Sequence, residues 1–281
     1  MAERVAVLGA GQMGNGIAHV FAQSGFDVTM IDISADALEK GKGTIASNLD
    51  RQIKKGSLPA TDKDAILGRI RTATSTDAVS DATIVIEAVT ENRDLKFKIF
   101  ADLDAKAPKG AILASNTSSI SITEIAARTK RPESVIGMHF MNPVPVMQLV
   151  EIIRGLATSD GVLSRVVELS KAVGKTPVEA RDFPGFIANR ILMPMINEAV
   201  YCLMEGVGTA EAIDTVMKLG MNHPLGPLAL ADLIGLDTCL AIMEVLHDGI
   251  GDPKYRPCPL LRTYVAAGWL GRKTKRGFYT Y

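Results

Sequence analysis

The first part of the chain contains two patterns of hydrophobic residues, one typical of strands and one typical of helices. Through roughly the first 180 residues, short apolar runs rich in Val and Ile alternate with longer segments in which apolar residues recur at helical spacing. This alternation predicts βα units around a mostly parallel sheet. The predicted strands are 4–8, 27–31, 70–74, 83–88, 111–115, 135–139, 149–153 and 176–179, and the predicted helices are 12–23, 35–55, 92–105, 122–128 and 163–173.

The strand pattern stops after Asp182, and the remaining sequence has helical periodicity broken by Gly-Pro and Asp-Pro pairs. Pro184 suits the first turn of the first of these helices. The sequence therefore predicts an α/β domain with a Rossmann-type, mostly parallel sheet over residues 1–182 and an all-helical domain over 183–281. The predicted helices of the second domain are 186–204, 209–219, 227–246 and 259–267.

The composition argues against proteins that bind nucleic acid or membranes through their overall charge. The 31 Lys and Arg residues balance the 31 Asp and Glu residues, so no overall charge attracts the protein to nucleic acid or to a membrane surface. Residues 5–26 contain no charged residue, but five glycines and several amides interrupt them, and we expect no membrane span there. The odd number of cysteines, Cys202, Cys239 and Cys258, suits a reducing cytoplasm, and we expect all three to be buried fillers of the core.

A glycine-rich loop follows the first predicted strand. Its six residues read G-A-G-Q-M-G, with Gly9, Gly11 and Gly14 at the positions of a dinucleotide fingerprint and Gln12 and Met13 between them. The helix that begins here offers free N–H groups to a pyrophosphate. Asp32 lies 18 residues beyond the last glycine, where a carboxylate accepts a hydrogen bond from the adenosine ribose and repels a 2′-phosphate. The pattern favours NAD over NADP, with a flavin, or a turn that binds no cofactor, as the alternatives.

A histidine and a glutamate stand on consecutive predicted strands. His139 ends one strand, Glu151 lies 12 residues later on the next, and Pro143 and Pro145 lie between them, where the chain has room to turn back. A carboxylate on one ring nitrogen would stabilise the imidazolium and leave the other nitrogen to act on a hydroxyl group. A lone histidine is more often structural, but the position at a strand end and the partner favour general acid–base chemistry.

Several motifs carry a resemblance to a known family. They are S-N-T-S-S-I from residue 115, G-M-H-F-M-N-P-V-P-V-M from 137, L-V-E-I-I from 149, and D-F-P-G-F-I-A-N-R from 182. Together with the glycine loop, they resemble the L-3-hydroxyacyl-CoA dehydrogenase family over essentially the whole chain, and the length is similar to that of its bacterial 3-hydroxybutyryl-CoA members. The resemblance implies an NAD-dependent enzyme that interconverts (S)-3-hydroxyacyl-CoA, with 3-hydroxybutyryl-CoA expected, and 3-ketoacyl-CoA such as acetoacetyl-CoA.

The resemblance also implies roles for single residues. His139 and Glu151 match the catalytic dyad, and Ser118 and Asn189 match groups that hold the substrate's oxygens. From the residues alone, Ser118 has the alternative of capping a helix and Asn189 that of a core amide. Four further residues match cofactor contacts, although the sequence alone places the first two at the start of a helix: Glu91, Lys96, Asn142 and Lys273.

The helix predicted over 35–55 has a basic face. A solvated surface is the default interpretation of its cations, which are Lys40, Lys42, Arg51, Lys54 and Lys55. The resemblance implies instead that Lys55 meets the phosphates of coenzyme A. Asn48 stands where the family has a coenzyme-A-binding serine, with Ser47 beside it.

The helical domain ends in a basic tail that faces no acid after Asp252 and is available to a phosphate or a partner subunit. Its cations are Arg262, Arg272, Lys273, Lys275 and Arg276. The remaining histidines, His19, His223 and His247, lack metal-ligand spacing, and we expect no metal. We expect a homodimer formed through the helical domain. Two other functions stay open: a dehydrogenase of a free hydroxy acid or sugar acid, and a non-catalytic NAD-binding structural protein.

Overall fold

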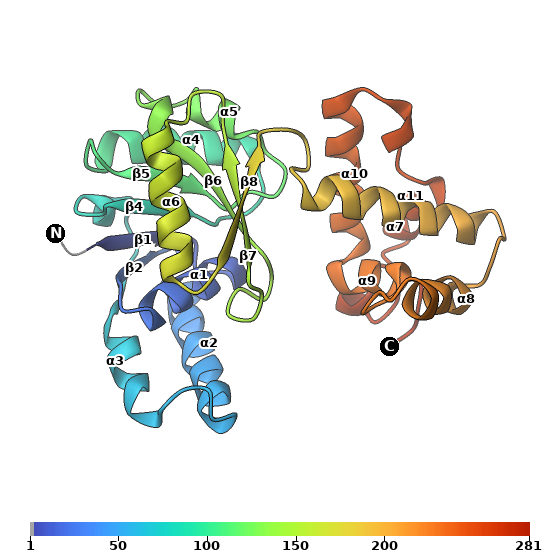
Figure 1. Ribbon diagram of the computed structural model, residues 1–281, viewed down its shortest axis with the longest axis horizontal. Coiled ribbons are helices and arrows are strands. Elements are labelled where there is room, and N and C mark those ends of the chain that lie inside the picture. Colours follow the sequence, from blue (N-terminus) through green and yellow to red (C-terminus); the bar gives the residue numbers. More distant parts are fainter. Residues whose placement is uncertain (1–2) are drawn as a thin grey trace. The chain divides into compact units, whose positions relative to one another are not determined.

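The computed structural model describes residues 3–281. The chain divides into two compact units, Met1–Asp182 and Phe183–Tyr281. This division lies where the strand pattern of the sequence ends. Each unit has its own hydrophobic core, and each is described below by itself (Figure 1).

The first unit is built on one eight-stranded sheet with the strand order β3-β2-β1-β4-β5-β6-β7-β8. Its strands are parallel except that β6 pairs antiparallel with β7. The strands are β1 (Arg4–Leu8), β2 (Asp27–Ile31), β3 (Ile70–Ala73), β4 (Ile84–Glu87), β5 (Ile112–Ser115), β6 (Val135–Phe140), β7 (Leu149–Arg154) and β8 (Thr176–Arg181). The predicted Rossmann-type, mostly parallel sheet is confirmed.

Helices cover both faces of this sheet, as the continuous apolar strands require. α1 and α6 share one core with the strands, while α4 and α5 lie on the opposite face (Figure 1). The helices are α1 (Gln12–Gln23), α2 (Ala35–Lys54), α3 (Lys63–Gly68), α4 (Arg93–Lys106), α5 (Ile122–Ala126) and α6 (Asp160–Ala172). The sequence pattern missed α3, and α6 begins at Asp160 rather than at 163 because the Ser159 side chain accepts a hydrogen bond from the Val162 N–H.

The second unit consists of helices around a separate apolar core, which confirms the predicted all-helical region. They are α7 (Ala188–Met204), α8 (Ala210–Thr215), α9 (Pro227–Ile234), α10 (Leu236–Ile250) and α11 (Pro259–Ala266). The single helix predicted over 227–246 is wrong, because Gly235 has a φ of 105° and separates two helices. The prediction for Pro184 is also wrong. Phe186 has a positive φ of 49°, so α7 begins only at Ala188.

The cysteines differ from the sequence expectation in one case. Cys239 and Cys258 are buried, but Cys202 is only half-buried, so the expectation of three buried fillers is wrong at that position. Cys202 lies near the end of α7, where one side of the helix faces away from the core. Burial raises the pKa of the Cys239 thiol to about 12, which keeps it an inert thiol in the core.

Candidate active site

The loop between β1 and α1 has the form that its three glycines predict. Gly9 has a φ of 103°, and a Cβ there would stand 2.6 Å from the carbonyl oxygen of Ala88. A Cβ on Gly14 would stand 1.8 Å from the carbonyl oxygen of Gly9. At Gly11, by contrast, no atom of residues 3–281 beyond the adjoining chain comes within 4 Å of the Cβ position. The protein itself requires the first and third glycines, and the second faces open space that a pyrophosphate can enter.

Asp32 lies directly beside this loop. Its Oδ2 accepts a hydrogen bond from the Ala10 N–H at 2.8 Å, and its Oδ1 accepts one from the Ser34 N–H at 3.0 Å. The Ser34 side chain in turn accepts from the Ala37 N–H and caps α2. The carboxylate is therefore fixed at the end of β2 and half-exposed, where it can meet a ribose hydroxyl. Loop and acid together fit NAD.

His139 and Glu151 face each other across the antiparallel pair β6 and β7. The two residues are direct register partners, and His139 Nδ1 lies 2.8 Å from Glu151 Oε2. Only 8% of His139 and 2% of Glu151 is exposed to solvent. A carboxylate can only accept a hydrogen bond, so in the neutral ring Nδ1 carries the hydrogen and Nε2 is the basic nitrogen. Because β6 runs parallel to β5, the pair lies at the carboxyl edge of the sheet, where open α/β sheets bind their ligands.

A hydrogen bond joins the segment that carries Ser118 to the strand that carries His139. Asn116 Oδ1 accepts a hydrogen bond from the Phe140 N–H at 2.9 Å, directly after His139 in the chain. The half-buried Ser118 donates its own backbone N–H to Glu91 Oε1 at 2.9 Å. The alternative in which Ser118 caps the following helix is wrong, because the Ser121 side chain takes that position at the start of α5.

A buried charge network lies under this segment. Lys96 is fully buried, and its ammonium group lies 2.6 Å from Glu87 and 3.4 Å from Glu91. Glu87 was not singled out from the sequence, although a carboxylate inside the apolar run 83–88 was a signal that could have found it. Burial acts to raise the pKa of Glu91, but the charge of Lys96 and hydrogen bonds from the Ser118 segment outweigh it, so this pKa is lowered.

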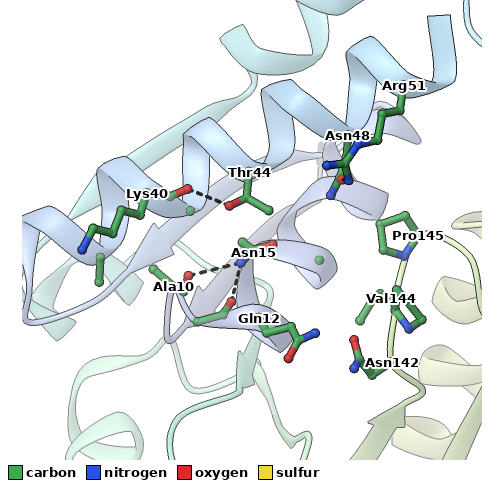
Figure 2. Close-up of a pocket in the computed structure, with 15 residues that line it drawn as sticks. Ala10, Gln12, Asn15, Lys40, Thr44, Asn48, Arg51, Asn142, Val144 and Pro145 are labelled. Carbon is green, nitrogen blue, oxygen red and sulfur yellow. Dashed lines mark hydrogen bonds between the residues drawn. The ribbon is translucent and has the colours of Figure 1, made fainter. Parts of the chain in front are cut away.

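A cavity of about 550 Å³ opens beside the glycine loop. Figure 2 shows α2 on one side of it, with Lys40, Thr44, Asn48 and Arg51, and the segment Asn142, Val144 and Pro145 on the other. Among the described residues that line it, the charged side chains are the two cations Lys40 and Arg51. The predicted contacts Asn48 and Asn142 line this cavity, whereas Lys55, directly after α2, is exposed and outside the set of lining residues.

Two predicted site residues belong to the helical unit. Asn189 is the second residue of α7 and is only 8% exposed. Lys273 forms an ion pair with Asp237 at the start of α10. Their predicted roles as substrate and cofactor contacts stay predictions.

The basic tail is partly neutralised within its own unit. Arg262 pairs with Glu244 at 2.5 Å, and Lys273 pairs with Asp237. The guanidinium of Arg276 lies 3.6 Å from the centre of the Trp269 ring. The expectation of cations without opposing acids is therefore wrong for Arg262 and Lys273, because the acids come from α10, which precedes the tail.

Two general features of residues 3–281 bear on the kind of site. Their histidines, cysteines and carboxylates form no cluster of three or more suited to a metal ion. None of the helices within them combines the length and apolar character needed to cross a membrane.

Comparison with known families decides the relationship. Residues 4–183 match the NAD-binding domain of 3-hydroxyacyl-CoA dehydrogenase, and residues 185–281 match the C-terminal domain of the same family. The chain belongs to the 3-hydroxyacyl-CoA dehydrogenase family. This confirms the predicted family and its class, an NAD-dependent oxidoreductase.

Individual members of the family resemble the chain over its full length. It is 58% identical to the probable 3-hydroxybutyryl-CoA dehydrogenase of Bacillus subtilis, covering 99% of this chain and 97% of that protein. It is also 58% identical to the 3-hydroxybutyryl-CoA dehydrogenase of Bradyrhizobium diazoefficiens, covering 99% and 95%. The crystal structure of (S)-3-hydroxybutyryl-CoA dehydrogenase from Ralstonia eutropha superposes with a TM-score of 0.97 at 57% identity, covering 100% and 99%.

Proposed function

We propose that this protein interconverts (S)-3-hydroxybutyryl-CoA and acetoacetyl-CoA with NAD, using His139 as the general acid and base. The observation that carries the proposal is the contact of 2.8 Å between His139 Nδ1 and Glu151 Oε2 in the unit that holds the dinucleotide loop. The names of the relatives that are 58% identical over nearly the whole chain support the choice of substrate.

In the oxidative direction, Nε2 of His139 takes the proton of the 3-hydroxyl group. Glu151 stabilises the imidazolium that forms, since its carboxylate is buried against the other ring nitrogen. Bound NAD supplies the acceptor for the hydride that leaves C3. In the reductive direction, the His139 imidazolium returns the proton to the 3-oxygen.

The proposed contacts with the substrate are those that the resemblance of the sequence motifs implies, and the cavity supports one of them. Ser118 and Asn189 hold the 3-oxygen and the thioester carbonyl. Asn48 on α2 and Lys55 directly after this helix approach the nucleotide end of coenzyme A, and the lining position of Asn48 supports its share of this role. Of the family's cofactor contacts, Asn142 and the half-exposed Glu91 are accessible, whereas the ammonium group of Lys96 acts from below through Glu91.

We further propose a cytoplasmic homodimer that associates through the helical unit. This unit exposes large apolar side chains that water does not favour, among them Ile191, Val207, Val216, Leu219 and Met221, which are 59–82% exposed. Sedimentation tests this: a dimer that Leu219→Glu converts to a monomer is the expected result, and a monomeric wild type contradicts it.

The test of the reaction is NADH oxidation with acetoacetyl-CoA and, separately, with free acetoacetate. We expect turnover of the thioester and little of the free acid. Preference for the free acid would identify the protein as a hydroxy-acid dehydrogenase instead. If His139→Gln and the wild type both lack turnover while binding NADH, the non-catalytic alternative holds.

A further inference from the structure

Glu87 is a buried carboxylate that the proposed reaction does not use. It ends β4 after three buried apolar residues, and none of its surface is exposed. Burying a carboxylate is unfavourable unless hydrogen bonds or an opposite charge compensate it. A residue of this kind in the centre of the sheet therefore calls for a physical account.

The carboxylate of Glu87 is fully engaged by the protein itself. Its Oε1 accepts hydrogen bonds from the Lys96 ammonium at 2.6 Å and from the Val89 N–H at 2.7 Å. Its Oε2 accepts one from the Ser115 hydroxyl at 2.6 Å. Ser115 also accepts from the Thr117 N–H at 3.2 Å. Glu87 thus acts on its neighbours and lies beneath the surface that a substrate can reach.

Lys96 extends this network to the surface. Its ammonium group lies 3.4 Å from Glu91 Oε2 while it donates to Glu87. The other oxygen of Glu91, Oε1, accepts from the Thr117 hydroxyl at 2.6 Å, from the Ser118 N–H at 2.9 Å and from the Ser119 N–H at 3.1 Å. One carboxylate oxygen of Glu91 therefore binds the backbone N–H groups of both Ser118 and Ser119.

We propose that Glu87 is a positioning residue, which locks Lys96 so that Glu91 holds the Ser118 segment in one conformation. The role of Ser118 in this statement rests on the proposed function. If Glu87 loses its charge, the Lys96 ammonium is no longer held in one place beside Glu91, and the Ser118 segment loses the fixed anchor that keeps its amides hydrogen-bonded.

The first test uses the protein without substrate or NADH and measures amide hydrogen exchange in a peptide covering residues 115–121. In Glu87→Gln we expect exchange at Ser118 and Ser119 to rise by about tenfold or more, because a charge-assisted network is lost. The matched control is Asp104→Asn. Asp104 forms another buried ion pair, with Arg131 at 2.8 Å, near the opposite end of α4.

The control separates positioning from a general loss of stability. Exchange that rises equally in residues 115–121 of both variants, or in neither, overturns the proposal. If Glu87→Gln does not fold, the double variant Glu87→Gln/Lys96→Met is measured in its place, because it removes both charges of the buried pair. Wild-type exchange at Ser118 and Ser119 in that double variant also overturns the proposal.

The second test asks whether Glu87 acts through Glu91. With acetoacetyl-CoA, we expect Glu87→Gln and Glu91→Gln each to lower kcat by about tenfold, and the double variant to be no slower than Glu91→Gln alone. Multiplying losses would show that Glu87 acts independently and overturn the proposal. A wild type that does not reduce acetoacetyl-CoA contradicts the proposed function instead, and the exchange measurement still decides the positioning role.

Discussion

Two buried histidines of the first unit show how surroundings determine chemistry. His139, at the carboxyl edge of the sheet, has the Glu151 carboxylate 2.8 Å from its Nδ1. His19, inside α1, is fully buried, and neither of its ring nitrogens has a partner in hydrogen-bond geometry among residues 3–281. Burial alone keeps an imidazole neutral, whereas burial with a carboxylate partner allows it to take up a proton.

The charges around His19 reinforce this difference. Burial lowers the pKa of His19 to about 4, with Lys175 acting in the same direction and the nearby Gln23 side chain opposing it. Lys175 is itself held in place, because its ammonium donates to the carbonyl oxygens of Val144 and Met147 at 2.5 and 2.8 Å. His19 therefore lies beside a cation, and His139 beside an anion. The comparison predicts that the first histidine affects stability and the second affects turnover.

The largest expected effect concerns His139. His139→Gln keeps a polar side chain of similar size but removes the group that exchanges the proton, so kcat should fall by about 10² to 10⁴. NADH binding, measured by fluorescence titration, should remain close to that of the wild type. Near-wild-type turnover between pH 6 and pH 9 would end the proposed mechanism.

Glu151→Gln tests the partner rather than the base. The amide keeps the shape but loses the charge that stabilises the imidazolium formed during proton transfer, so kcat should fall by about 10². The double variant with His139→Gln should be little slower than His139→Gln alone, because Glu151 acts only through the ring. A merely structural Glu151 would give additive losses together with a lower melting temperature.

The surroundings of His139 could be predicted from the sequence, whereas those of His19 could not. Short apolar runs predicted the strands that carry His139 and Glu151, and a chain that turns back between them pairs the two residues. For His19, the sequence showed only that metal-ligand spacing is lacking. Its ring has no hydrogen-bond partner within residues 3–281 because of how α1 packs, which no local pattern encodes.

The same reasoning explains the elements that were missed. α3 is only six residues long, which is too short for a periodic signal. Glu87 and Lys96 lie nine residues apart in the sequence, and their pairing arises only when α4 packs on the sheet. Asn48 and Arg51 are two of several polar residues along α2, and the sequence alone could not show which of these residues line the cavity.

His19→Leu sharpens the comparison from the other side. In the wild type, the folded state must keep His19 neutral below its usual pKa of 6.5, whereas the unfolded chain takes up the proton. Stability is therefore lost as the pH falls from about 6.5 towards 4, on the order of 2 kcal/mol from this residue. Thermal unfolding across this range should be less pH-dependent in His19→Leu, while kcat at neutral pH stays within about twofold. An unchanged pH dependence would contradict the assignment.

Asp32 gives the smallest expected effect and extends the comparison to a carboxylate that meets solvent. Unlike Glu151, it is half-exposed and its partners are backbone N–H groups, so we expect it to select the cofactor and to take no part in proton transfer. Asp32→Ala should weaken NADH binding by about tenfold, roughly 1.5 kcal/mol, with less loss or a gain for NADPH because the repulsion of a 2′-phosphate disappears. Titration of both cofactors measures this. Asp32→Asn is the matched control, since it keeps the shape and an acceptor for the Ala10 N–H while removing the charge. A wild type that prefers NADPH by tenfold or more would show that this carboxylate does not select the cofactor, because its charge should disfavour the phosphate whatever the rest of the site contributes.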